Sequence, residues 1–178
     1  MSRFLWILVP LAIVGACAVQ DAAPAPLARS TAASESASFV AGYDDRDCNL
    51  QTPLRPGVPG SPGNLIASNR NPNGDSELSV LMRRFVDDLR EARPRLEKGE
   101  PVAPLFAVHR TMRCAWPTKP DERNERFDAM AIAYLHLVRA YDEAPGKETY
   151  NGIIAGCIAC HSQSCGGPID FIDGMIWR

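Results

Sequence analysis

Five consecutive residues near the C-terminus, Cys157-Ile158-Ala159-Cys160-His161, constrain this 178-residue chain more than any other feature. Two cysteines three positions apart lie on one face of a helix, where both sulfurs can reach the vinyl groups of a single porphyrin. The histidine that follows can direct its imidazole at the iron as an axial ligand. The pattern predicts one covalently attached haem c per chain, with Cys157 and Cys160 as thioethers and His161 as iron ligand.

Two other uses of paired cysteines fit the sequence less well. A thioredoxin-type dithiol requires a strand before the motif and a helix after it, whereas residues 147–164 have helical periodicity throughout. A structural zinc site requires a second pair of ligands at similar spacing, whereas Cys114 and Cys165 stand alone in the sequence. Haem attachment is therefore the use that we expect.

The N-terminus has the layout of a secretory signal. Arg3 precedes an apolar stretch that is too short for a comfortable membrane span. Residues 14–17, Val-Gly-Ala-Cys, resemble a bacterial lipobox, which makes residues 1–16 a lipoprotein-type signal peptide and Cys17 the acylated first residue of the mature chain. Ordinary cleavage after Ala18 is the alternative. We expect the protein on the periplasmic side of a bacterial membrane, lipid-anchored, or soluble in the periplasm after cleavage.

Composition narrows the class of partner and the compartment. The formal net charge is −2 and the chain has no basic run, so we expect no nucleic-acid partner. Six cysteines suit an oxidising compartment or a cofactor better than the cytosol. Residues 17–75 are predicted to form a lipidated tether and an irregular arm: residues 18–40 are rich in Ala, Ser and Pro, and residues 41–75 are rich in turn residues.

Residues 76–164 carry four segments with helical periodicity and no strand-like alternation. Asp75 or Ser76 can cap the start of the first helix, and Gly99 can end it. Within this helix, Pro94 is expected to introduce a kink or a division.

The other three segments have equally clear limits in the sequence. The second is expected over residues 102–115, and the third is expected to be capped by Asp121 and to end before Pro145. The fourth is expected over residues 147–164 and contains the haem motif. Four amphipathic helices with short connections predict an all-α domain over residues 76–178, an antiparallel four-helix bundle with the haem on the C-terminal helix.

The helical part of the chain resembles the cytochrome c prime family and its low-spin four-helix-bundle relatives. The resemblance covers roughly residues 76–164 and rests on the position of the haem motif in the last helix and on the apolar patterns of the four helices. The residues that carry it are Leu81, Met82 and Phe85, Leu96 to Gly99, Phe127 to Tyr141, and Tyr150 to His161. It implies a haem-binding four-helix fold. The family often has an arginine four residues after the haem histidine, where this chain has Cys165.

The geometry of the predicted bundle indicates which residues could be the sixth iron ligand. The start of the first helix and the end of the fourth share one end of an antiparallel bundle, and these helices are neighbours. At 1.5 Å per residue, Met82 lies about 10 Å and His161 about 5 Å from that end. Met82 is therefore the first candidate, and it also falls at the family's distal position. His109 lies on the diagonal second helix and is the next candidate, an open sixth site is the third reading, and His136 lies too far away.

The sixth ligand decides between two functions. A Met–His pair closes the iron and suits outer-sphere electron transfer, which predicts a monohaem electron carrier tethered to the membrane, with a redox partner protein. An open iron predicts a gas-binding haem protein of the cytochrome c prime type, for nitric oxide or carbon monoxide. A haem subunit of a larger assembly is a third class. We assign no catalytic residue and expect no enzyme, and a homodimer is one of the states that the sequence leaves open.

Three cysteines remain besides the haem motif and Cys17. In an exported protein two of Cys48, Cys114 and Cys165 are expected to form a disulfide. The expected topology brings all three to one end of the bundle and so permits any pair. The Cys114–Cys165 pair is slightly preferred, because each of these residues closes a helix at that end.

Overall fold

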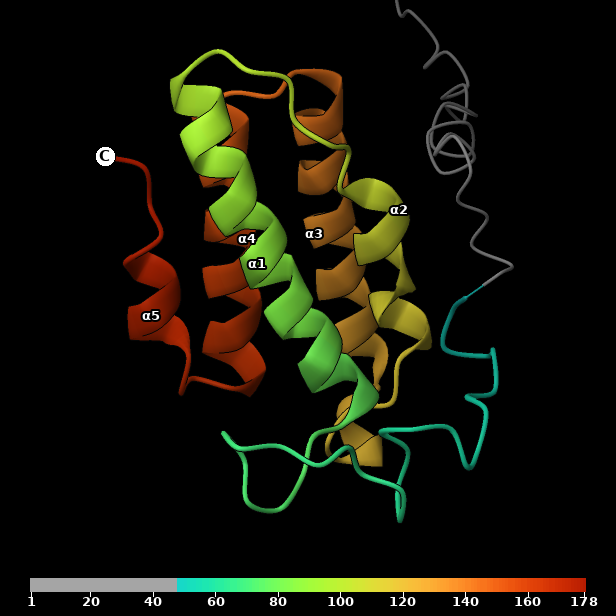
Figure 1. Ribbon diagram of the computed structural model, residues 1–178. Coiled ribbons are helices and arrows are strands. Elements are labelled where there is room, and N and C mark those ends of the chain that lie inside the picture. The colour runs from blue at the N-terminus through green and yellow to red at the C-terminus, as the bar shows by residue number, and fades with distance from the viewer. Residues whose placement is uncertain (1–47) are drawn as a thin grey trace, which may run out of the picture.

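The computed structural model describes residues 48–178, which form an all-α structure (Figure 1). No β-strand occurs among these residues, only two isolated bridges in the arm. The predicted signal peptide at 1–16, Cys17 and the predicted tether over residues 18–40 lie outside the described residues. In chain order the helices are α1 (Glu77–Glu97), α2 (Phe106–His109), the 3₁₀ helices η2 (Arg110–Cys114) and η3 (Pro120–Glu122), α3 (Glu125–Glu143), α4 (Lys147–Ser164) and α5 (Ile169–Asp173).

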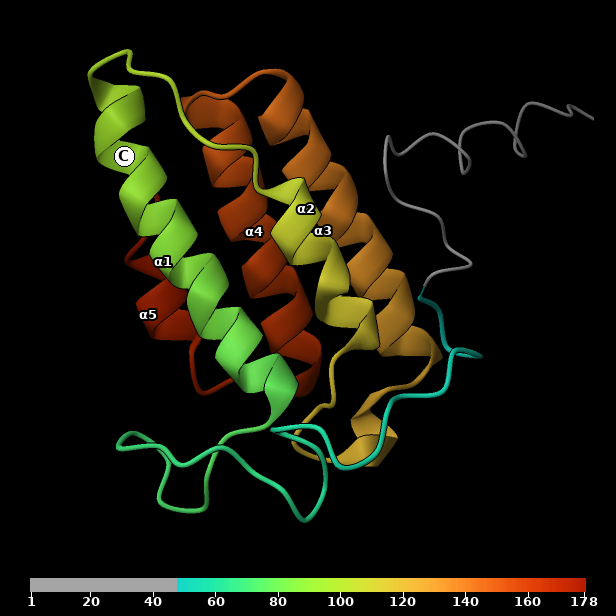
Figure 2. The same cartoon turned by 45° about the vertical axis from the view of Figure 1, so that its right-hand side comes forward.

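Helix α4 packs against three other α-helices. It contacts α1, α3 and α5, while α2 packs against α3. Helices α1 and α3 run in one direction along the molecule and α4 runs in the other (Figures 1 and 2). The apolar faces of these helices form one core, whose most buried members include Phe85, Leu89, Ala131, Val138, Tyr141, Tyr150, Ile153 and Ile154.

Helix α1 begins and ends close to where the sequence predicts. The hydroxyl of Ser76 accepts a hydrogen bond from the N–H of Ser79 at 3.2 Å and so caps the first turn. Gly99 follows the C-cap with a φ of +70°, a left-handed conformation that glycine adopts without strain. Contrary to expectation, Pro94 does not divide the helix, which continues to Glu97. Pro94 lies exposed in the last turn, and its missing N–H costs the helix one backbone hydrogen bond, the one that the carbonyl of Arg90 would accept.

The second helical segment is shorter than the predicted 102–115. Its α-helical part begins only at Phe106, because the carboxylate of Asp142 accepts hydrogen bonds from the N–H groups of Leu105 and Phe106 at 2.8 and 2.9 Å. These N–H groups belong to the unpaired first turn of a helix, so a distant carboxylate fixes its start. The 3₁₀ helix η2 then continues the segment to Cys114.

The predicted N-cap of α3 was wrong, whereas the predicted bounds of α4 are confirmed. Asp121 does not cap α3, because it lies within η3. The cap is Asn124, whose side-chain oxygen accepts a hydrogen bond from the N–H of Phe127 at 3.1 Å. The bounds of α4 agree with the predicted residues 147–164.

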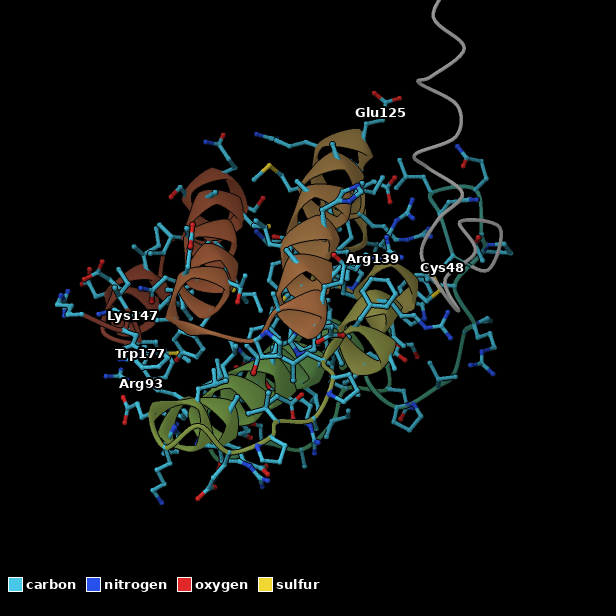
Figure 3. The ribbon with its side chains drawn as sticks, turned by 90° about the horizontal axis from the view of Figure 1, so that it is seen from above. Cys48, Arg93, Glu125, Arg139, Lys147 and Trp177 are labelled. Carbon is cyan, nitrogen blue, oxygen red and sulfur yellow. A yellow bond between two sulfur atoms is a disulfide. The ribbon has the colours of Figure 1, made fainter. Side chains whose placement is uncertain are left out.

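The C-terminal segment forms a helix, α5, that the sequence did not indicate. The hydroxyl of Tyr150 donates to the carbonyl of Met175 at 3.3 Å, which ties this segment to α4. Asn151 and Trp177 exchange two hydrogen bonds at 2.9 and 2.8 Å. Figure 3 shows the Trp177 side chain next to Lys147, whose amine lies 5.9 Å from the indole ring centre. The tail is therefore part of the folded domain.

A disulfide joins Cys48 in the arm to Cys114 at the end of η2, and the label in Figure 3 marks the arm residue. The slight preference for Cys114–Cys165 was wrong, since Cys165 is an exposed free thiol. The reason is the path of the arm. The guanidinium of Arg123 donates to three backbone carbonyls within residues 49–52, which holds the chain after Cys48 beside η2 and η3.

Replacing Cys48 by Ser should lower the free energy of unfolding by about 2–5 kcal/mol, because the bridge closes a long loop in the unfolded chain. Chemical denaturation of the exported protein measures this loss. Cys165→Ser is the matched control and should leave stability unchanged. Peptide mapping without reduction should recover the Cys48–Cys114 bridge, and a bridge that contains Cys165 would contradict the structure.

Candidate functional site

An apolar cavity of about 440 Å³ lies between α1, α4 and the C-terminal segment. This volume falls within the range of typical cofactor and ligand sites. Met82, Cys157, Cys160 and His161 all line it, so the structure brings the four residues that were predicted to bind the haem to one place. Most of the remaining wall is apolar and comprises Leu78, Phe85, Val86, Leu89, Phe127, Ile154, Pro168, Phe171, Ile172 and Met175.

Helical periodicity explains why these residues share the cavity. Leu78, Met82, Phe85 and Leu89 follow one another at spacings of four, three and four, which places them on one face of α1. On α4, the face that begins with Ile154 continues through the haem motif to the end of the helix. The cavity is therefore built where the apolar faces of two long helices meet.

His161 is oriented by the end of its own helix. Its Nδ1 lies 2.9 Å from the backbone carbonyl of Cys165, the C-cap residue of α4. A carbonyl can only accept, so Nδ1 donates its proton, and in the neutral ring Nε2 then carries the free lone pair. Metal-binding histidines in proteins usually make this kind of hydrogen bond through their second nitrogen. The sequence analysis missed this contact, although a free carbonyl four residues after a histidine at a helix end is a readable signal.

The two thiols of the motif are poor nucleophiles in this environment. Burial raises the pKa of Cys157 to about 12, and burial also raises the pKa of Cys160. Both lie in the last turns of α4, where the helix dipole disfavours a negative charge. Thiolates are the reactive form in dithiol redox chemistry, so these thiols do not resemble a catalytic pair.

The side chains of the cavity also indicate whether it suits a haem or a simple metal ion. Within residues 48–178, no group of three or more His, Cys, Asp or Glu side chains is placed to hold a metal ion. A haem brings four porphyrin nitrogens and needs from the protein only axial ligands, which His161 and Met82 could supply. An apolar cavity with two thiols and one oriented imidazole fits a haem better than a bare cation.

His109, the second candidate for the sixth ligand, is not brought to the cavity. Its side chain is fully buried, with 0% exposure, and stacks on Phe85 with the ring centres 3.8 Å apart. Its Nδ1 lies 2.7 Å from the hydroxyl oxygen of Tyr134. Burial lowers the pKa of His109 to about 3, so the ring is neutral at physiological pH and its approach to Asp88 is no ion pair.

Two arginines that the sequence analysis did not single out also line the cavity. Arg83 follows Met82 on α1 and forms a bidentate pair with the buried Asp75. A hydrogen bond from Ser68 and the charge of Arg83 hold the pKa of Asp75 below its usual value. The second, Arg70, comes from the arm, so the arm contributes positive charge to the same site.

No family model matches this chain, and no curated protein or solved structure is significantly similar to it. No helix among residues 48–178 is long and apolar enough to span a bilayer.

Acidification should destabilise the protein through His109. The unfolded chain has a histidine pKa near 6.5 and the folded ring a pKa of about 3, so the unfolded state binds more protons as the pH falls through this window. The contribution of His109 to the free energy of unfolding is fully present above pH 6.5. It should decline by several kcal/mol toward pH 3, at about 1.4 kcal/mol per pKa unit. Urea unfolding at a series of pH values measures the decline.

The matched variants are His109→Gln and His136→Gln, because His136 is exposed. His109→Gln should flatten the pH dependence of the unfolding free energy, while His136→Gln should leave it as in the wild type. Equal slopes in all three proteins would contradict a buried neutral His109.

Proposed function

We propose that this protein is a monohaem c-type cytochrome that carries electrons, with α1, α2 with η2, α3 and α4 acting as an antiparallel four-helix haem domain. The observation that carries the proposal is the shared cavity of Cys157, Cys160, His161 and Met82. The resemblance of the sequence to the cytochrome c prime family and its low-spin relatives supports the same reading.

The roles of the chain follow from the chemistry of its side chains. Cys157 and Cys160 would hold one haem c through thioether bonds, and Nε2 of His161 would bind the iron. When bound, the haem supplies a reversible one-electron couple. The carbonyl of Cys165 holds the imidazole in the tautomer that can ligate and increases its basicity. The apolar walls limit water, and Arg70 would offer positive charge to the haem carboxylates, while the charge of Arg83 is paired with Asp75.

Met82 is the proposed sixth ligand. It is half-buried on α1 and lines the cavity that His161 lines from α4. A thioether sulfur is a soft and neutral ligand that raises the potential of a haem and closes the iron to exogenous molecules. This arrangement suits electron transfer to and from a redox partner protein.

Gas binding is the second candidate function. Leu78, Phe85, Val86 and Leu89 make the α1 side of the cavity largely apolar around Met82, although Ser79 and Arg83 also line it. If the Met82 sulfur stays off the iron, the open position faces this apolar wall, which suits nitric oxide or carbon monoxide.

An exported location belongs to the same proposal. The Cys48–Cys114 disulfide is typical of an oxidising compartment such as the bacterial periplasm. Acylation of Cys17 would tether the domain to the membrane, and ordinary signal cleavage would leave it soluble in the periplasm.

Removal of the two motif sulfurs tests the haem. In cells that export and mature c-type cytochromes, the doubly substituted Cys157→Ala, Cys160→Ala protein should carry no covalent haem, and each single variant should carry haem through one bond only. Intact-protein mass spectrometry detects the added haem, and the pyridine haemochrome spectrum, which reports the remaining vinyl groups, distinguishes one thioether bond from two. Cys165→Ala is the control and should keep both bonds, and covalent haem on the double variant would refute the assignment.

Met82→Leu tests the sixth ligand with little change in volume, at a stability cost that is usually under about 1.5 kcal/mol. If the sulfur binds the iron, this variant should become high-spin, should have a lower reduction potential and should bind carbon monoxide. Absorption spectra with and without carbon monoxide detect all of these changes except the potential, which a redox titration gives.

Met112→Leu is the matched control for this experiment, because Met112 is buried in the core and does not line the cavity. It should behave as the wild type. A low-spin spectrum that survives in Met82→Leu would exclude Met82. A wild-type protein that is already high-spin and reactive toward carbon monoxide would favour the gas-binding function.

A further inference from the structure

Three aromatic rings from three different helices lie in a stack behind the cavity wall. Phe85 on α1 lines the cavity and stacks on His109 of α2, with the ring centres 3.8 Å apart and the ring planes 20° apart. The ring centre of Tyr134 on α3 lies 5.9 Å from each of the other two, and its plane is within 16° of theirs. Neither His109 nor Tyr134 lines the cavity. We call Phe85, His109 and Tyr134 the aromatic brace.

A buried hydrogen bond fixes the middle ring of the brace. Nδ1 of His109 lies 2.7 Å from the hydroxyl oxygen of Tyr134, and the two residues are 0% and 4% exposed. Within residues 48–178, Nε2 of His109 has no hydrogen-bond partner, and Asp88 approaches it only at 3.5 Å. Rotation of the imidazole would break the bond to Tyr134 and leave both groups unsatisfied in the core, which is costly. The face on which Phe85 rests is therefore held in one orientation.

The brace reaches α4 at the residue before the haem motif. A Cβ added at Gly156 would lie 3.4 Å from Cδ2 of Tyr134, so the ring of Tyr134 packs against α4 at this position. The three rings therefore span the distance from α4 to α1 behind the cavity. Met82 precedes Phe85 by three residues, about one helical turn, and lines the same cavity. The position of Phe85 consequently limits how far the Met82 segment of α1 can move relative to the haem motif.

We propose that His109 and Tyr134 are positioning residues: by holding Phe85 in place, they keep Met82 at a fixed distance from α4 and so keep its sulfur on the haem iron. The inference rests on the proposed function, because it takes Met82 as the sixth ligand. His109 and Tyr134 do not line the cavity, so both act only through Phe85.

The chemistry of the pair suits a positioning role better than simple filling of the core. Burying an imidazole and a phenol hydroxyl costs solvation free energy that two aliphatic side chains would not cost. A satisfied buried hydrogen bond has a definite geometry, however, and restricts the packing around it to one arrangement. A methionine sulfur is a neutral ligand without charge attraction to the iron, so its place has to be set by the helix that carries it.

Carbon monoxide binding to the reduced, haem-loaded protein is the first test, because carbon monoxide has to displace the Met82 sulfur. Tyr134→Phe keeps the ring and removes the hydrogen bond to His109, so the rate of binding should rise about tenfold, as expected for the loss of one buried hydrogen bond. The sulfur-to-iron charge-transfer band of the oxidised protein should also weaken. A Tyr134→Phe protein with the rate and the band of the wild type would overturn the proposal.

Tyr141→Phe is the matched control. Tyr141 lies about two turns further along α3, is fully buried, and has no hydrogen-bond partner for its hydroxyl among the described residues. This variant should bind carbon monoxide at the wild-type rate. A rise equal to that of Tyr134→Phe would mean that general loosening of the core sets the rate, which would contradict a specific role of the brace.

A double-mutant cycle tests whether Tyr134 acts through Phe85. If it does, Tyr134→Phe should accelerate carbon monoxide binding far less in a Phe85→Leu background than in the wild-type background, because the ring that it holds is no longer there. Equal acceleration in both backgrounds would show that the two residues act independently and would refute the brace.

Rotation of the Phe85 ring is measured on the exported protein whether or not it carries haem. With 3-fluorophenylalanine in place of phenylalanine, fluorine NMR identifies the Phe85 signal by its absence from Phe85→Leu. The ring should rotate faster in Tyr134→Phe than in the wild type and at the wild-type rate in Tyr141→Phe, and equal rotation in all three would overturn the brace.

The outcomes separate this inference from the proposed function. A chain without covalent haem would refute the proposed function, and the ring rotation would still decide whether the brace exists. A haem that is attached but not ligated by Met82 would overturn the inference and leave the proposed attachment intact.

Discussion

Helix α4 has to pack against α3 on one side and present the cavity on another, and the rest of the structure depends on how it does both. The α3 side is made of small residues: a Cβ added at Gly156 would lie 2.7 Å from Cδ1 of Leu137 and 3.4 Å from the ring of Tyr134. The lack of a side chain at this position lets Leu137 and Tyr134 of α3 come close to α4. The cavity-facing residues of α4 then remain available to face α1.

The two ends of α4 complete this arrangement. At the C-terminal end, the free carbonyl of Cys165 orients His161, so an ordinary property of helix termini prepares the proposed iron ligand. At the N-terminal end, Tyr150 and Asn151 hold the tail of the chain, and that tail supplies part of the cavity wall. One helix therefore carries the attachment motif, the orientation of the imidazole and the closure of the site.

The sequence-based predictions were accurate where an element is fixed by residues close in sequence, and they failed where it is fixed by distant residues. Helices α1 and α4 were predicted nearly to the residue, because Ser76, Gly99 and the break before Lys147 act within a few positions of the helix ends. The start of α2 could not be predicted, since the carboxylate that fixes it belongs to Asp142 on another helix. Helix α5 is too short to have a periodic pattern, and the disulfide depends on the path of an irregular arm.

The same distinction holds for the site. The motif residues and Met82 were found because they lie at helical spacings on faces that meet. His109 has a similar spacing, but it is used inside the core, where stacking on Phe85 and the hydrogen bond with Tyr134 hold it away from the cavity. A single chain gives no sign of the contribution of Arg70, because it depends on how the arm lies against the domain.

The pyridine haemochrome spectrum of the exported wild-type protein, recorded after acid–acetone extraction, tests the central claim most directly. The spectrum reports how many vinyl groups of the porphyrin remain, and the extraction removes any haem that is not covalently held. We predict that the haem stays on the polypeptide with the spectrum of a porphyrin in which both vinyl groups have reacted. Haem that passes entirely into the organic phase, or a chain that carries none when other c-type cytochromes mature in the same cells, would contradict the account.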